Sequence, residues 1–437
     1  MSDAPRVYVS PPRAFPAPTP AAPESHALAG LNPAQREAVL HGDGALLVVA
    51  GAGTGKTRTL VHRVAHLVAR GVPPERILLL TFTRRAAQEM LTRAERLCGA
   101  AGQRVHGGTF HGTAHRLLRR FGQVAGIAPN FTVLDQGDAE DLMQLSRVAL
   151  GHAEAKEERG ARGGRPGGAR SFPKKETLAR VYSRHVNTER PVAQILAEEY
   201  PQFTARIADV LAVFRDYAER KAARNLVDYD DLLLFWATML EASPALGRQI
   251  AGLYDHVLVD EYQDTNVLQA RVLAGMCRGP EAGGGRGSGH RNVTAVGDDA
   301  QSIYGFRGAH HRNILDFPAR FAGTRVVALE ENYRARQPIL DVANAVMAGA
   351  AHRYEKRLWT ARGGTERPWL VSCRDAHAEA RFGSTACSNS STQGGACATS
   401  RCSFAPPRTP RSSRSSSPRA ACRSRNGAGS SSSRRRT

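Results

Sequence analysis

The segment LLVVAGAGTGKTRTL, at residues 46–60, constrains the fold more than any other part of the chain. It begins as an apolar run typical of a buried parallel strand and continues as a loop of small residues before a helical pattern. Such a loop leaves main-chain N–H groups free to converge on an anion at the start of the helix, where the dipole also favours negative charge. We therefore predict an α/β fold that binds a polyphosphate.

The loop AGAGTGKT, at residues 50–57, fits the P-loop pattern with Ala50 where the first glycine usually stands. We expect Lys56 to neutralise the β- and γ-phosphates of ATP and Thr57 to ligate Mg²⁺. The alternative is a Gly-rich turn without function, which the strand before it and the helix after it disfavour. The candidate nucleotide-binding residues of this loop are Ala50, Gly51, Ala52, Gly53, Thr54, Gly55, Lys56 and Thr57.

The run HVLVDEYQD, at residues 256–264, supplies the carboxylates that a P-loop site needs at the end of a neighbouring strand. We expect Asp260 to hold the metal through water and Glu261 to act as the general base that orients the attacking water. An acidic turn that only ends a strand is the alternative for this run taken alone.

Strand-like apolar runs recur between helical stretches along the chain. Continuous Val, Leu and Ile flanked by helices predict a parallel sheet that is covered on both faces. The intervening residues 112–226 are mostly helical in pattern and include a polar, Gly-rich insertion at 153–176 that we expect to be flexible. The predicted strands lie within residues 45–51, 77–83, 256–261, 293–299 and 324–333.

The formal net charge of +20 is concentrated at the end of the chain, because residues 381–437 contain eleven Arg and no Lys, Asp or Glu. The moderate surplus elsewhere suits a nucleic-acid partner, although a solvated basic surface would look the same. No apolar run is long enough to span a bilayer, and the Pro-rich start lacks a hydrophobic signal core, so we expect a cytoplasmic protein. Four of the seven cysteines lie in the basic tail at spacings that match no zinc pattern.

The last 57 residues contain no Leu, Ile, Val, Met, Trp or Tyr, so they cannot bury enough surface to offset the entropy of ordering. An Arg-, Ser- and Cys-rich composition of this kind is typical of a shifted reading frame of GC-rich DNA. We expect residues after about 381 to be foreign to the fold, and a basic disordered tail that binds nucleic acid is the alternative.

The segments VDEYQDTN (259–266) and VGDDAQSIYGFRGA (296–309) resemble the UvrD/Rep/PcrA group of superfamily 1 DNA helicases. Five further segments match the family's motifs in the family's order, and the resemblance covers about residues 29–372. These segments are LNPAQREAV (31–39), TFTRRAAQEM (81–90), GTFHGTAHRLLRR (108–120), LVDYDDLL (226–233) and LEENYR (329–334).

The resemblance implies an adenine site in which Gln35 bonds the edge of the base while Arg58 and Tyr333 sandwich its ring. It also implies that Gln301 touches the γ-phosphate and that Arg334 reaches it as an arginine finger. The alternative to these adenine contacts is an ordinary structural role for each residue: Gln35 would be a helix-face residue and Tyr333 a core aromatic.

The resemblance further implies contacts to single-stranded DNA, on whose bases aromatic rings at strand ends can stack. Core packing is the alternative role for each aromatic, and the i, i+4 histidine pair at 111 and 115 lacks the Glu of a metalloprotease site. The candidate DNA-binding residues are Phe82, Arg84, Phe110, His111, Tyr304 and Phe306, with Arg85 and Arg307 nearby.

We therefore predict a RecA-like P-loop NTPase sheet with an inserted helical subdomain and the start of a second RecA-like lobe. The expected function is an ATP-dependent 3′-to-5′ DNA helicase or translocase in repair or recombination, acting on single strands and single/double-strand junctions without a membrane partner. The alternatives are a remnant that binds ATP and DNA with little unwinding, and a P-loop kinase, which would leave Gln301 without a role. The expected parts are a Pro-rich arm (1–28), the first lobe (29–111 and 227–325), the helical subdomain (112–226), the second lobe (326–380) and the tail (381–437).

Overall fold

The computed structural model describes residues 27–152, 172–278, 292–305 and 308–392. The chain divides into two compact units, residues 1–367 and 368–437, and each is described by itself. Among the described helices, none combines the length and the apolar character that crossing a membrane requires.

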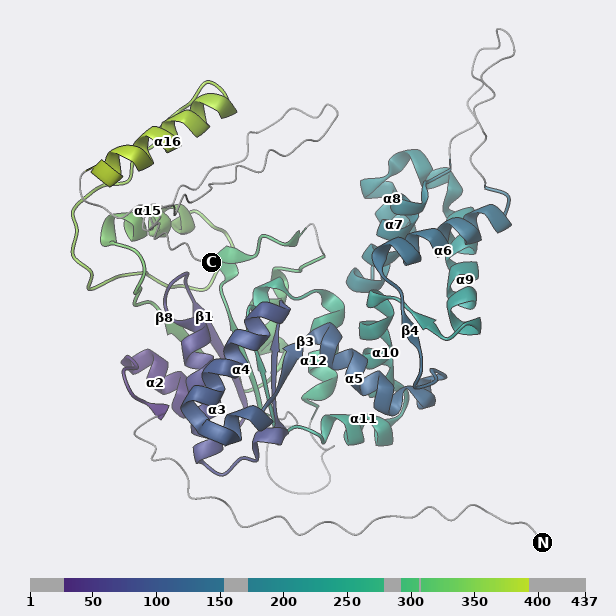
Figure 1. The fold of residues 1–437 in the computed structure, drawn as a ribbon, viewed down its shortest axis with the longest axis horizontal. Helices are drawn as coiled ribbons and strands as arrows, with labels where there is room; N and C mark the ends of the chain where they lie inside the picture. The colour runs from purple at the N-terminus through teal and green to yellow at the C-terminus, as the bar shows by residue number, and fades with distance from the viewer. Residues whose placement is uncertain (1–26, 153–171, 279–291, 306–307, 393–437) are drawn as a thin grey trace, which may run out of the picture. The chain divides into compact units, whose positions relative to one another are not determined.

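The first unit is built on a six-stranded sheet in the order β3-β2-β6-β7-β1-β8, and every pair of neighbouring strands is parallel (Figure 1). This confirms the predicted α/β fold with a parallel sheet, and each predicted apolar run contributes a strand. The strands are β1 (Ala45–Ala50), β2 (Ile77–Thr81), β3 (His106–Thr109), β6 (His256–Val259), β7 (Asn292–Gly297) and β8 (Arg325–Leu329).

Alternation along the strands divides the core between the two faces of the sheet. On β1, Leu46 and Val48 pack with one group of helices, whereas Leu47 and Val49 pack with the other. The first group is α2 (Pro33–Leu40), α3 (Lys56–Ala69) and α4 (Arg84–Cys98). The second group is α5 (Phe110–Phe121), α10 (Tyr229–Ala242), α11 (Pro244–Ala251), α12 (Val267–Met276), α13 (Arg312–Leu315) and α14 (Phe317–Arg320).

The helical insertion has a hydrophobic core of its own and lies apart from the sheet (Figure 1). Its elements are β4 (Thr132–Val133), α6 (Gln136–Ala149), α7 (Lys175–Thr188), α8 (Val192–Glu199), α9 (Ile207–Ala223) and β5 (Leu226–Val227). The predicted start of this subdomain at residue 112 falls within helix α5, whose apolar face packs into the core beside the sheet. The insertion's own core begins at Leu134.

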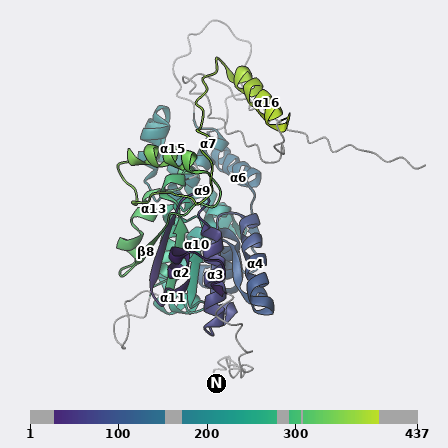
Figure 2. The same cartoon turned by 90° about the vertical axis from the view of Figure 1, so that its left-hand side faces the viewer.

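The predicted border between the two lobes at 325/326 falls within β8, which pairs with β1 as the last strand of the first sheet. The residues that follow, including α15 (Gln337–Ala348), belong to the first unit as far as Arg367. The sequence alone could not decide to which domain β8 belongs, since a strand at a domain edge has the same apolar pattern in either domain. In both views α15 lies beyond the carboxyl ends of β1 and β8 (Figures 1 and 2).

Three segments that we predicted to be irregular include residues for which the structure shows defined contacts or helix. Ala27, in the predicted arm, is buried, and its carbonyl lies 2.7 Å from His62 Nδ1. The predicted loop 153–176 ends in the first turn of α7, and its residues 153–171 lie outside the described residues. The second unit contains α16 (Ala376–Thr392), which runs past the predicted break at 381. Asp375, just before this helix, accepts from the Ala378 N–H at 2.8 Å. The remaining tail, 393–437, lies outside the described residues.

Candidate nucleotide-binding and hydrolysis site

The loop after β1 opens directly into helix α3 and takes the form that a phosphate cradle requires. Gly53 and Gly55 have φ of 79° and 91°, a backbone region that favours glycine. The Thr54 hydroxyl donates to Gly51 O at 2.8 Å, which ties the loop to itself. Because α3 begins at Lys56 and is 14 residues long, the loop places main-chain N–H groups at the positive end of a helix dipole.

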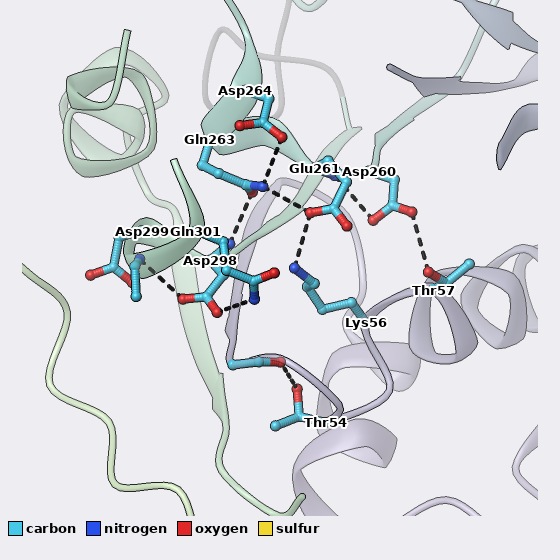
Figure 3. Close-up of polar contacts among 12 residues, drawn as sticks. Thr54, Lys56, Thr57, Asp260, Glu261, Gln263, Asp264, Asp298, Asp299 and Gln301 are labelled. Carbon is cyan, nitrogen blue, oxygen red and sulfur yellow. Dashed lines mark hydrogen bonds and ion pairs between the residues drawn. The ribbon is translucent and has the colours of Figure 1, made fainter. Parts of the chain in front are cut away.

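The Lys56 ammonium lies 2.9 Å from Glu261 Oε2, and the Thr57 hydroxyl donates to Asp260 Oδ2 at 3.3 Å (Figure 3). The two loops meet because β1 and β6 are parallel, so both of their carboxyl ends lie at one edge of the sheet. The predicted lysine, hydroxyl and carboxylate pair are therefore brought together as one cluster.

Asp260 is 4% exposed, and burial together with the charge of Glu261 raises its pKa to about 6. A buried carboxylate beside a threonine hydroxyl is a set of hard oxygen donors, which fits Mg²⁺. Thr57 and Asp260 are the residues that would hold it. Glu261 has φ of 51°, a strained conformation for a residue with a side chain, and such strain often occurs at functional sites.

Gln263 connects the carboxylate cluster to the loop after β7. Its amide nitrogen donates to Glu261 Oε2 at 2.8 Å, and its amide oxygen accepts from the Asp298 N–H at 3.0 Å (Figure 3). The Gln301 amide in turn donates to Asp298 Oδ2. The predicted γ-phosphate contact, Gln301, is thus linked to the predicted base through two intermediate residues, Asp298 and Gln263.

Gln35 is fully buried, and both ends of its amide are engaged with protein atoms. Its nitrogen donates to Thr54 O at 2.9 Å, and its oxygen accepts from the Asn32 N–H at 3.2 Å in a capping box. Gln35 therefore braces the P-loop from the start of α2. Its contact to an adenine edge remains a prediction.

Tyr333 and Arg58 are both exposed near the start of α2. The Tyr333 hydroxyl donates to Glu331 Oε2 at 2.8 Å and accepts from Asn32 Nδ2 at 2.9 Å. Burial and the bond to Glu331 raise the pKa of this hydroxyl, and Arg58 lies close enough for its charge to oppose them. An exposed ring and a guanidinium near the P-loop have the chemistry of the predicted adenine sandwich.

The turn that carries Tyr333 is fastened to the P-loop by main-chain and side-chain bonds. The Tyr333 N–H donates to Gly53 O at 2.9 Å, and the buried Asn332 amide donates to Ala52 O. Asn332 Oδ1 also accepts from the Arg334 N–H at 2.8 Å. Arg334 lies so near the loop that a Cβ added at Gly53 would stand 2.8 Å from the Arg334 Cβ, so only glycine fits there.

The predicted DNA-binding aromatics divide into two groups. Phe82, after β2, and Tyr304, after β7, lie with ring centroids 5.4 Å apart and are both partly exposed. Phe110, the first residue of α5, is only 3% exposed and packs with Trp236 in the core beside the sheet. This position agrees with the alternative role of core packing, and base stacking by Phe110 remains a prediction.

His111 packs edge-on against Tyr229, and burial lowers its pKa to about 4, so the ring is neutral near pH 7. Arg84 and Arg85 are exposed in the first turn of α4. Phe306 and Arg307 lie outside the described residues. The exposed DNA candidates therefore gather at the ends of β2 and β7, on the same sheet edge as the P-loop.

A family model described as the UvrD/REP helicase N-terminal domain matches residues 31–322 of this chain. The chain belongs to the UvrD/REP helicase family. It is 39% identical over 362 residues to the ATP-dependent DNA helicase UvrD1 of Mycobacterium tuberculosis (strain H37Rv), covering 82% of this chain and 44% of that protein. It is 34% identical over 357 residues to the ATP-dependent DNA helicase PcrA of Leuconostoc citreum, covering 81% and 44%.

A probable DNA helicase II homolog of Rickettsia felis is 35% identical over 360 residues, which covers 80% of this chain and 50% of that protein. The chain thus spans about half the length of the curated relatives it matches. Residues 31–322, which the family model matches, include the P-loop, the carboxylate pair and the loop of Gln301.

Within this UvrD/REP site, sequence reasoning missed Gln263 and Asn332. Both lie inside motif segments, in DEYQD and LEENYR, and their amides bond other residues of the site. An amide that bridges two parts of a site has no periodicity or composition that would distinguish it beforehand.

Proposed function

We propose that this chain carries the ATP-hydrolysing site of a 3′-to-5′ DNA helicase, which couples ATP turnover to movement along a single strand. The observation that carries the proposal is the joining of Lys56 to Glu261 and of Thr57 to Asp260 at one sheet edge. Membership of the UvrD/REP family supports the DNA substrate, and the direction and a role in repair rest on the motif resemblance alone.

The hydrolytic chemistry follows from the roles that these side chains are able to take. Lys56 would leave Glu261 for the β- and γ-phosphates, where its charge offsets that of the triphosphate. Glu261, once freed, would accept a hydrogen bond from water and orient it toward the γ-phosphorus. Mg²⁺, when bound through Thr57 and Asp260, would neutralise further phosphate charge.

Coupling to DNA would run through the segment that follows β7. Gln301 and Tyr304 are three residues apart on this segment, so the residue expected at the γ-phosphate and a ring able to stack on a base share one short piece of chain. Contacts that form only when the γ-phosphate is present would shift this segment between two arrangements. Loss of the γ-phosphate would then change the grip on the strand.

The test compares ATP turnover by the purified chain without DNA, with single-stranded DNA and with blunt duplex, and then follows unwinding of duplexes with a 3′ or a 5′ tail. We expect single strands to stimulate turnover far more than blunt duplex, and ATP-dependent unwinding of the 3′-tailed duplex only. Glu261→Gln serves as the matched control that lacks the base. Turnover that is indifferent to DNA would contradict the proposal, and equal unwinding from both tails would contradict the direction.

A further inference from the structure

The residues after α15, at 354–360, are joined to the nucleotide site although no motif identified in the sequence includes them. The Leu358 side chain lies against the P-loop so closely that a Cβ added at Gly51 would stand 2.5 Å from Leu358 Cδ2. The Trp359 carbonyl accepts from the Asn332 N–H at 2.7 Å. This segment therefore touches both the P-loop and the turn that presents Arg334.

Lys356, in the middle of this segment, pairs with two adjacent carboxylates. Its Nζ lies 2.5 Å from Asp298 Oδ1 and also bonds Asp299 Oδ1. The three side chains are 7%, 3% and 5% exposed, respectively. Two carboxylates buried side by side repel each other, so the lysine charge is what allows them to lie together.

Asp298 is shared between Lys356 and Gln301. Lys356 binds Oδ1, while the Gln301 amide donates to Oδ2 (the latter bond is drawn in Figure 3). A γ-phosphate and Asp298 would compete for the same Gln301 amide. Because Lys356 offsets part of the Asp298 charge, it weakens the hold that Asp298 has on Gln301.

We propose that Lys356 is a positioning residue for ATP turnover: by holding Asp298 on one oxygen, it sets how readily Gln301 on the other turns to the γ-phosphate. The inference rests on the proposed function, and it adds to the proposed ATP site a residue that acts on Gln301 through Asp298. Its direct consequence is that Lys356 governs how strongly the site prefers ATP over ADP, since only ATP carries the γ-phosphate.

The test measures equilibrium affinities for ADP and for a non-hydrolysable ATP analogue in the full chain, together with thermal unfolding. Lys356→Met alone leaves two buried carboxylates unpaired and could unfold the protein, so the informative variant is Lys356→Met with Asp299→Asn. Lys356→Arg is the conservative variant. Arg357→Ala removes an exposed charge from the same segment as a matched control.

We expect Lys356→Met/Asp299→Asn to remain folded and to lose about fivefold or more of the ATP-over-ADP preference, as Gln301→Ala does, with little change in ADP affinity. In a triple variant that combines Lys356→Met/Asp299→Asn with Gln301→Ala, we expect no further loss of the ATP-over-ADP preference. The reason is that the Lys356 and Gln301 substitutions act through the same contact of Gln301 to the γ-phosphate. Lys356→Arg would retain most of the preference and Arg357→Ala all of it.

A folded Lys356→Met/Asp299→Asn variant with the full ATP preference would overturn the inference, and so would a loss that adds to that of Gln301→Ala. Both results would leave the proposed function intact. Failure of the unsubstituted chain to bind either nucleotide would instead overturn the proposed function, and the inference with it.

Discussion

Lys56 and Glu261 form a 2.9 Å ion pair between the loops that follow β1 and β6, with strand β7 lying between those two strands in the sheet. The lysine ammonium is therefore engaged by a carboxylate of the protein. A nucleotide that recruits Lys56 has to break this pair, and breaking it releases the carboxylate expected to orient water. Binding and activation are in this way coupled through one contact.

Glu261→Gln tests this coupling. The substitution removes the partner that competes for Lys56, and a partly exposed pair is worth about 0–1 kcal/mol, so we expect ATP binding to tighten by up to about fivefold. ATP turnover would fall by at least about 100-fold because the base is lost. Titration with a fluorescent ATP analogue and a phosphate-release assay measure the two effects, and weaker binding by this variant would contradict the competition.

Asp260→Asn is expected to stabilise the protein in a pH-dependent way. The pKa of Asp260 is about 6 in the folded chain against an ordinary 3.8, so the folded state holds the proton more tightly and stability from this group is lost as pH rises through 6. The amide would raise the free energy of unfolding at pH 7.5 by up to about 3 kcal/mol, and the gain would shrink by about pH 4.

Thermal unfolding of the nucleotide-free chain at several pH values measures this effect. Asp209→Asn, at a half-exposed carboxylate on α9, serves as the control with no such gain. A gain that is the same at pH 4 and pH 7.5 would show that charge burial at Asp260 is not the cause.

Arg63 is expected to be important for stability although it lies outside the ligand site. The residue is 1% exposed, and its guanidinium donates to the Thr294 hydroxyl and to main-chain carbonyls at the end of α2 and in the turn beyond it. Arg63→Met would leave these oxygens buried without donors, at a cost of about 3 kcal/mol or more. Chemical denaturation beside Arg70→Met, an exposed arginine at the end of the same helix, checks this; equal midpoints for both variants would refute it.

Phe82→Ala and Phe110→Ala are expected to separate DNA binding from folding. Phe82 is partly exposed at the sheet edge, so its loss would weaken single-strand binding by about 1–3 kcal/mol with little change in stability. Phe110 is in the core, so its loss would destabilise the fold by about 3–5 kcal/mol. Fluorescence anisotropy with a labelled oligonucleotide and thermal unfolding distinguish the two, and a reversed pattern would favour Phe110 as a DNA contact.

The sequence was sufficient to predict those parts of the fold that short-range patterns encode. The apolar runs at β1, β2, β6 and β7 and the glycines of the P-loop depend on neighbouring residues only, and they lie where expected. Placing β8 required knowledge of its partner, because register with β1 is a long-range property. Similarly, Phe110 lies within the motif segment at 108–120, but the direction of its side chain depends on how α5 packs.

The same distinction holds for the site. Lys56, Thr57, Asp260 and Glu261 could be predicted as one cluster because they follow the carboxyl ends of β1 and β6 in short recognisable segments. Lys356 could not, since its significance arises only when a segment 55 residues after Gln301 in the sequence returns to the same sheet edge.

The most direct test of the account is equilibrium binding of Mg·ATP to the purified chain beside the Lys56→Ala variant, with single-strand-stimulated turnover measured in the same samples. Lys56→Ala removes the cation expected at the β- and γ-phosphates while leaving a small residue in a loop made mostly of small residues. We predict saturable binding and stimulated turnover in the unsubstituted chain, with both lost or reduced at least about 100-fold in the variant. Equal ATP binding and turnover by the two proteins would contradict the account.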